Sequence, residues 1–188
     1  MSEFEFISVF VSIVVAFAMA ELLMGWGRLI RARDRIQRPF FFIGWTSWLL
    51  LLMCFHYLGI WEYQAVDFYN VGQLVLLLLP PIVLVLLTFV LTPEINPGQT
   101  IDLEQHYFDV HHWFFTLAIV FLLLALIADM MLPTFAATWE SRLILEAIIV
   151  LSLVFVYFSN NRVAHISIMG FNLVYLIFGS IVQNVRDL

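Results

Sequence analysis

The chain has 188 residues, of which 63% are hydrophobic and 12% charged, and its mean hydropathy is +1.00. A soluble domain of this length has too little interior to bury so much apolar surface, so we expect lipid to surround most of the chain. The basic residues are all arginine, and their placement is more informative than the net charge of −6. The single cysteine, Cys54, excludes a framework of internal disulfides.

Six apolar stretches are long enough, or nearly long enough, to cross a membrane. A helix needs roughly 20 apolar residues to span a hydrocarbon core about 30 Å thick. Because the stretches are continuous and do not alternate with polar residues, they predict helices and not the strands of a barrel. We therefore predict an all-α bundle that forms a single transmembrane domain, with spans at residues 6–27, 39–61, 71–92, 113–132, 141–158 and 163–182.

Five arginines follow the first predicted span and define the orientation of the bundle. They are Arg28, Arg31, Arg33, Arg35 and Arg38. Arginine-rich connections stay in the cytoplasm, so this loop is predicted inside and both chain termini outside. Arg162 agrees with this orientation, whereas Arg142 and Arg186 fall on the predicted outside. The same five arginines are expected to contact anionic lipid headgroups, and their position beside a span gives no support for nucleic-acid binding.

Two connections between the predicted spans are informative. Residues 159–162 are so few that the fifth and sixth spans must form an antiparallel hairpin. The long connection, residues 93–112, contains a Pro97-Gly98 turn and then reads IDLEQHYFDVHH. Because this segment mixes charged with apolar residues, it predicts a short amphipathic helix that lies at the inner interface before the fourth span.

Glu21 is an ionisable residue inside the first predicted span. Such residues are rare in lipid and usually face protein or water, so each one is a candidate functional group. Glu21 shares a helix face with Ala18, Gly25 and Arg28, and the small residues predict close packing against another helix. Glu21 is then either a proton or cation site, or a carboxylate held by an arginine or hydroxyl that stabilises helix packing.

One face of the sixth predicted span is polar or small along its length. His165, Asn172 and Gly179 recur at seven-residue intervals, and Tyr175 lies one turn after Asn172. A water-lined path and a row of hydrogen bonds between helices predict the same pattern, and the second interpretation is slightly favoured.

Two adjacent prolines, Pro80 and Pro81, lie near the middle of the third predicted span. Each proline removes a backbone donor, so we expect the helix to kink and to free backbone carbonyls close to the bilayer centre. In transporters such interrupted helices contribute to midplane binding sites. Prolines also occur in ordinary membrane helices, and that interpretation is the simpler one.

Several charged residues are predicted near the outer side of the bundle. His56 and Asp129 are expected at the same depth, where they would pair, and Arg142 is expected to form a salt bridge with Glu146 one turn later. Together with Glu62 these residues would form an acidic outer mouth that attracts cations. The alternative is that Asp129 and Glu62 simply lie among the headgroups.

The histidines offer a further hypothesis. His106, Asp109 and His112 are spaced three residues apart, which is compatible with metal binding on a helix. The segment HYFDVHH is similar to one histidine box of membrane di-iron desaturases, but its spacing is wider and the chain has only five histidines. A haem held by His111 or His112 with His165 would lie close to the surface. No cofactor and no metal are therefore predicted.

The opening FEFISVFVSIVVAFAMAELLMGWGRLIRARDR, the tryptophan-rich second span and the later HYFDVHHWFF resemble short multi-spanning bacterial inner-membrane proteins of uncharacterised function. The resemblance extends over most of the chain and implies a location in a bacterial inner membrane. It carries no information on mechanism.

These observations lead to two main functional hypotheses. The first is a small channel or transporter for protons or a small cation, in which Glu21, His165 and Asn172 line an inner half-path, and Pro80 with Pro81 opens the middle. A homo-oligomer is expected if the pore is wide. The second is a non-transporting membrane subunit, either an assembly partner or a sensor, that acts through its cytoplasmic loops. An enzyme is the weakest alternative.

Overall fold

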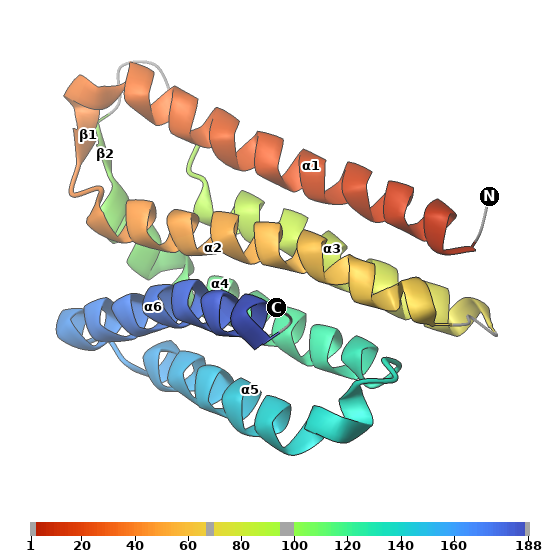
Figure 1. Ribbon diagram of the computed structural model, residues 1–188. Helices are drawn as coiled ribbons and strands as arrows, with labels where there is room; N and C mark the ends of the chain where they lie inside the picture. Colours follow the sequence, from red (N-terminus) through yellow and green to blue (C-terminus); the bar gives the residue numbers. More distant parts are fainter. Residues whose placement is uncertain (1–2, 67–69, 95–99, 187–188) are drawn as a thin grey trace.

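The computed structural model describes residues 3–66, 70–94 and 100–186 and shows a bundle of six α-helices (Figure 1). The helices are α1 (Glu3–Arg31), α2 (Phe40–Gly59), α3 (Val71–Leu91), α4 (Leu103–Asp129), α5 (Phe135–Phe158) and α6 (Arg162–Arg186). Short 3-10 helices follow α1 and α2, as η1 (Arg33–Arg35) and η2 (Ile60–Ala65). Two very short strands, β1 (Ile36–Gln37) and β2 (Ile101–Asp102), complete the described chain.

Five helical segments are long and apolar enough to cross a membrane, by their length and composition. They are Phe4–Arg31, Phe40–Ala65, Val71–Leu91, Leu103–Asp129 and Thr138–Phe158. The apolar part of α6, Arg162–Phe178, is shorter. Each of the six predicted spans thus corresponds to a helix, and the all-helical architecture is as expected. α1, α5 and α6 extend beyond the predicted ends, α4 begins earlier and ends earlier than predicted, and α2 and α3 lie within the predicted spans.

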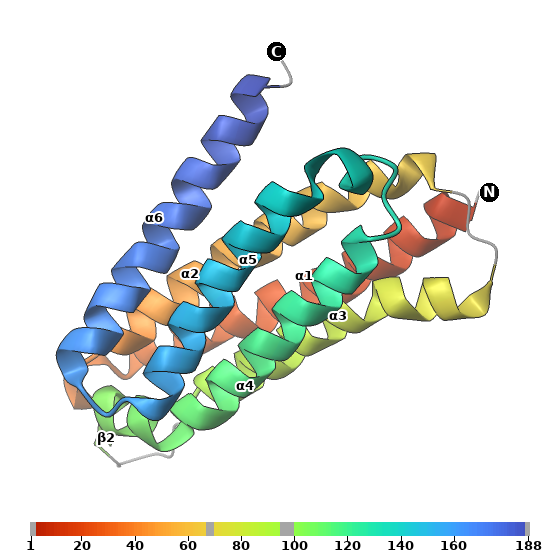
Figure 2. The same cartoon turned by 90° about the horizontal axis from the view of Figure 1, so that it is seen from below.

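The helices pack around α2, α3 and α4. α1 packs mainly on α3, α5 packs on α4, and α6 packs on α2 and α5. Large aromatic side chains of α2 and α4 fill the centre, where Trp45 contacts Trp48, Phe114 and Phe115 edge to face. Figure 2 shows α6 diverging from the other helices towards its C-terminal end. The interior of the bundle is therefore built from rings.

The segment before the fourth predicted span is not a separate interfacial helix, which corrects the sequence-based prediction. α4 begins at Leu103 and runs without interruption to Asp129. The side chain of Asp102 caps it by accepting hydrogen bonds from the backbone N–H groups of Glu104 and Gln105. Tyr107 is buried and stacks on Phe41 of α2, at 4.9 Å between ring centroids. Tertiary packing thus makes this segment the first turns of a long helix.

The connections that contain the arginines are tied together at one end of the bundle, which we call the arginine end. β1 and β2 pair in parallel, with Ile36 opposite Ile101 and Gln37 opposite Asp102 (Figure 1). Arg38 forms an ion pair with Asp102. The α5–α6 turn lies at the same end, where Arg162 pairs with Glu104 at 3.1 Å. Two residues are too few to produce a strand pattern, so the sequence did not predict this pairing.

The two prolines of α3 lie inside a single continuous helix. Pro80 and Pro81 are both buried, and the assigned helix extends through them from Val71 to Leu91. The described helix is therefore not interrupted at the prolines, and no gap is present there at which free carbonyl groups could line a path.

The close approach of α1 and α3 gives a matched pair of substitutions. A Cβ atom at Gly25 would lie 2.6 Å from Cγ2 of Thr92, whereas a Cβ at Gly27 would meet no atom within 4 Å. We expect Gly25→Ala to destabilise the protein by about 1–3 kcal/mol because the short Thr92 side chain cannot move away. Gly27→Ala should stabilise it by about 0.5–1 kcal/mol through the better helix propensity of alanine. Thermal unfolding in detergent measures both, and equal melting temperatures would contradict the close contact.

Candidate functional site

The charged and hydrogen-bonding side chains of the helices gather in three places. One group, which we call the histidine cluster, lies near the arginine end and consists of Tyr107, His111, Ser159 and His165. A second group, the far-end cluster, lies at the opposite end and consists of Glu62, Tyr63, Asp129, Arg142 and Glu146. The third is the ion pair of Glu21 with Arg28 on α1.

His165 of α6 is completely buried and joins three elements through its two ring nitrogens. Nε2 lies 2.7 Å from the carbonyl oxygen of Ser159, and Nδ1 lies 2.6 Å from the hydroxyl of Tyr107 on α4. A carbonyl oxygen can only accept, so Nε2 donates. In the neutral imidazole Nδ1 then accepts the hydrogen of the Tyr107 hydroxyl. His165 thus fastens the start of α6 both to its own turn and to α4.

His111 lies one turn beyond Tyr107 on the same face of α4, and its ring centroid is 5.5 Å from that of His165. Its Nδ1 lies 2.6 Å from the carbonyl oxygen of Phe108 and must donate to it. Its Nε2 is therefore an acceptor, and this buried atom has no hydrogen-bond partner among the described residues. Buried polar atoms without a partner are uncommon, so this nitrogen requires an explanation.

Asn172 continues the polar face of α6 and contacts α5. Its amide nitrogen donates to the hydroxyl of Ser152 at 3.2 Å and to the carbonyl of Ile168 at 2.9 Å. Asn172 is only 1% exposed. His165 and Asn172 are therefore both hydrogen-bonded to neighbouring elements, as a row of bonds between helices requires. The Oδ1 atom of Asn172 is buried and has no hydrogen-bond partner among the described residues.

The far-end cluster is organised around Asp129, the last residue of α4. The hydroxyl of Tyr63 donates to one carboxylate oxygen of Asp129 at 2.7 Å, and Arg142 of α5 donates to the other at 3.3 Å. Arg142 also reaches Glu62 at 3.4 Å. These bonds connect η2, α4 and α5 at this end of the bundle.

Two pairings predicted for this region are wrong. His56 does not pair with Asp129 in the described structure; its ring lies edge-on to Phe121, with centroids 5.4 Å apart, and its Nε2 has no hydrogen-bond partner among the described residues. The ion pairs of Arg142 in the described part of the chain are with Asp129 and Glu62, and not with Glu146. Both predictions used spacing along single helices, whereas Tyr63 and Glu62 come from a different connection. Three of the four predicted outer residues nevertheless lie close together.

Glu21 is held by an arginine from its own helix. Its carboxylate lies 2.7 Å from Arg28, and its side chain is 14% exposed. The predicted small-residue face is present, because Ala18 and Gly25 are both buried. α1 packs on α3 and α2, whereas α6 packs on α2 and α5. Glu21 therefore lies on the α1 side of α2, and His165 with Asn172 lies on the α6 side.

The histidine-rich start of α4 does not form the metal site considered from its spacing. No group of three or more His, Cys, Asp or Glu residues suited to a metal occurs within residues 3–66, 70–94 and 100–186. Asp109 and His112 are exposed, and His112 lies against Tyr157 with ring centroids 4.9 Å apart. His106 lies partly buried on a different side of the helix. Positions six residues apart do not share a helix face, which explains why these side chains diverge.

A haem between His111 and His165 is also not supported by the packing. The spacing had suggested a position close to the surface, but both histidines are buried. The ring centroids of Phe41, Phe108 and Phe115 lie 6.3, 5.0 and 6.0 Å from that of His165. These aromatic rings occupy the volume that a porphyrin would need.

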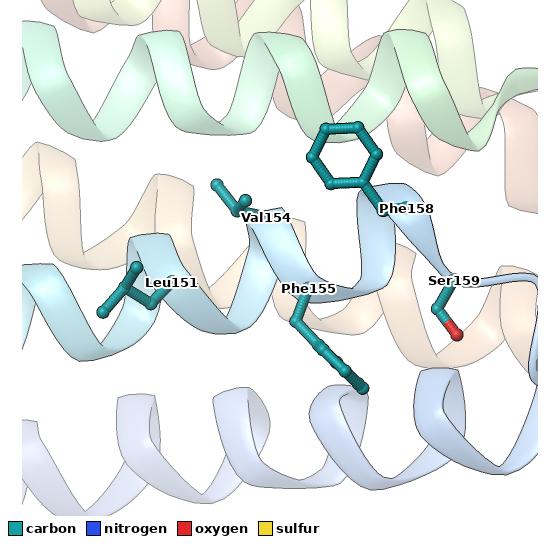
Figure 3. A pocket seen from close by; sticks show the side chains of 5 residues that line it. All are labelled: Leu151, Val154, Phe155, Phe158 and Ser159. Carbon is teal, nitrogen blue, oxygen red and sulfur yellow. The ribbon is translucent and has the colours of Figure 1, made fainter.

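A groove of about 440 Å³ runs along α5 (Figure 3). Its lining is apolar apart from one hydroxyl, and Figure 3 shows Phe155 directed towards α6. The lining residues are Leu151, Val154, Phe155, Phe158 and Ser159. None of these five side chains is charged, so the groove is suited to apolar groups and not to the passage of ions.

No family model, curated protein or solved structure matches this chain. Function must therefore be inferred from the site itself. Sequence reasoning missed Tyr107, Ser152 and Ser159, which supply the partners of the predicted residues His165 and Asn172. Glu104, Tyr107 and His111 are spaced by three and four residues, which places them on one face of a helix. This spacing was the available signal that Tyr107 belongs with the polar residues.

The bond between Tyr107 and His165 gives a testable consequence. Tyr107→Phe leaves Nδ1 of His165 buried without a donor, so we expect a loss of stability of about 1–3 kcal/mol. Tyr157→Phe is the matched control, because the Tyr157 hydroxyl makes no hydrogen bond to a described residue, and it should change stability by less than about 0.5 kcal/mol. Unfolding in mixed detergent micelles measures both; if the two variants lose the same stability, the hydrogen bond has no structural role.

Proposed function

We propose that this protein is a six-span protein of a bacterial inner membrane that serves as a non-transporting subunit, with the arginine end in the cytoplasm as its contact surface. The observation that carries the proposal is that some arginines at that end are paired with carboxylates of the chain and others are not. Arg28, Arg38 and Arg162 are neutralised by carboxylates of the same chain. Arg31 and Arg35 pair with no carboxylate among the described residues. Both termini then lie outside.

The proposed contact surface contains the exposed Arg31 and Arg33 and the half-buried Arg35, at the end of α1 and in η1. Arg33 has an 81% exposed side chain, and its nearest carboxylate is that of Asp34 at 3.9 Å, which is itself 93% exposed. An exposed pair of this kind contributes little stability and is readily exchanged for another partner. The paired strands and the capped start of α4 hold this surface in one shape. The chemistry fits an acidic segment of a partner protein, and anionic headgroups are expected around the rim.

The arrangement of the buried polar groups favours a subunit over a transporter. Glu21 is paired with Arg28, His165 uses both of its nitrogens, and Asn172 is bonded to α5. Between the two ends of the bundle lie buried aromatic and aliphatic side chains. A proton or ion path needs groups that exchange partners with water, whereas each of these groups is bonded to another residue of the chain.

Photocrosslinking in cells tests the contact surface. We expect a photoreactive residue in place of Arg33 to give one discrete protein adduct, and the same residue in place of the exposed Trp139 at the far end to give none. Arg31→Gln combined with Arg35→Gln should weaken that adduct severalfold, because the attraction is electrostatic. Adducts with lipid alone at Arg33, or the same adduct at both positions, would reject the proposed surface.

Transport of protons or a small cation is the second candidate, and one observation favours it. The far-end cluster contains three carboxylates, those of Glu62, Asp129 and Glu146, around the single guanidinium of Arg142. Glu146 also faces Tyr175 of α6. The resulting excess of negative charge would attract cations to this mouth.

Flux measurements in liposomes decide between the two functions. The subunit proposal expects the purified protein to carry no protons, Na⁺ or K⁺ above the level of empty vesicles. If transport is the function, Glu146→Gln should abolish the flux, whereas Glu140→Gln, an exposed carboxylate on the same helix, should leave it unchanged. A flux that depends on Glu146 would overturn the subunit proposal, and the absence of flux in the wild type would remove the transport candidate.

A further inference from the structure

The two buried histidines of the histidine cluster share a feature that is typical of metal ligands. A ligating histidine almost always donates the N–H of its other nitrogen to a carbonyl or carboxylate, which fixes the tautomer and the ring orientation. His111 donates from Nδ1 to the carbonyl of Phe108, and His165 donates from Nε2 to the carbonyl of Ser159. The lone pair of Nε2 of His111 has no partner among the described residues. That of Nδ1 of His165 accepts the hydrogen of the Tyr107 hydroxyl and becomes free when this hydroxyl loses its proton.

The separation of the two rings agrees with a shared ion. Two imidazoles that bind one ion through nitrogens at about 2.1 Å, with an angle between tetrahedral and trigonal, have ring centroids about 5 to 6 Å apart. The centroids of His111 and His165 are 5.5 Å apart. The hydroxyl of Tyr107 lies 2.6 Å from Nδ1 of His165, a hydrogen-bond distance. It would have to widen to about 3.3 Å for both atoms to bind one ion with tetrahedral geometry.

We propose that His111, His165 and Tyr107 form a binding site for a divalent transition metal ion, with Zn²⁺ or Cu²⁺ as the class of ion. The ligands are Nε2 of His111, Nδ1 of His165 and the phenolic oxygen of Tyr107. Imidazole nitrogens suit both ions, and three protein ligands leave a coordination position for water. This site does not depend on the proposed subunit function.

The charge of the site can be balanced by its own residues. When the oxygen of Tyr107 coordinates, its proton is released to water and the phenolate compensates one positive charge of the ion. Glu104 and Arg162, one turn before Tyr107 and His165 respectively, form an ion pair that is neutral overall. The exposed His112 adjoins His111, with ring centroids 3.9 Å apart, and marks the side from which an ion would enter.

His111 differs from the two other histidines that have an unpartnered buried nitrogen, because it lies beside a second buried histidine. His56 and His106 also have a buried Nε2 without a hydrogen-bond partner among the described residues. His56 lies edge-on to Phe121, and neither residue is part of a group of potential ligands that includes a second buried histidine. A single buried water on Nε2 of His111 is the competing explanation, and it predicts no metal affinity.

Metal titration of the purified protein tests the site. The purification tag is removed, the protein in detergent is treated with a chelator, and Cu²⁺ or Zn²⁺ is added while binding is followed by calorimetry. We expect one ion per chain in the wild type, and an electron paramagnetic resonance spectrum of the Cu²⁺ form that shows coupling to imidazole nitrogens. His111→Gln should weaken binding by at least roughly 10-fold, whereas His112→Gln, in the exposed neighbour, should not change it.

Tyr107→Phe separates coordination from folding. The tyrosine is identified as a ligand if this variant loses the visible phenolate-to-copper absorption but retains the nitrogen coupling. The melting temperatures of all variants show whether each one is folded. The proposal is overturned if the wild type takes up no stoichiometric metal, if His111→Gln and His112→Gln bind equally well, or if His112→Gln alone abolishes binding.

Discussion

A buried polar group needs a partner, and the bonds of His165 show how this requirement organises the arginine end of the bundle. Its two nitrogens engage Tyr107 of α4 and the carbonyl of Ser159 in the α5–α6 turn. Because both contacts are buried among aromatic rings, water cannot replace them without a large desolvation cost. These bonds fix the position of the start of α6, and Figure 2 shows that the helix diverges from the others towards its C-terminal end.

Several charged residues near the arginine end stabilise the fold by joining separate connections. Asp102 both caps α4 and pairs with Arg38, so one carboxylate joins two connections that are far apart in the sequence. Glu104 does the same for the α5–α6 turn through Arg162. Since these pairs bring separate loops together, the arginines left over stand on an ordered surface and not on a loose loop. This difference is what makes the arginine end a candidate for specific recognition.

Arg142 illustrates why the candidate site could be predicted only in part. Its residue type and depth indicated correctly that it belongs with Asp129 and other acidic residues near one end. Spacing on one helix suggested Glu146 as its partner, but Asp129 and Glu62 bind it instead, because the α4–α5 connection and η2 bring them to the same place. For His56 the depth was a poor guide, since depth does not specify the side of a helix that faces a given neighbour.

The sequence by itself determined that the chain is helical, that a helix corresponds to each apolar stretch, and which polar residues are exceptional. These properties depend on local hydropathy and on periodicity, which are visible in a linear chain. Tertiary structure alone decided that residues 103–112 belong to α4, that Tyr107 and Ser159 are the partners of His165, and that His111 lies beside it. Such contacts depend on the rotation of each helix about its axis and on which helices are neighbours, and no periodicity within one segment contains that information.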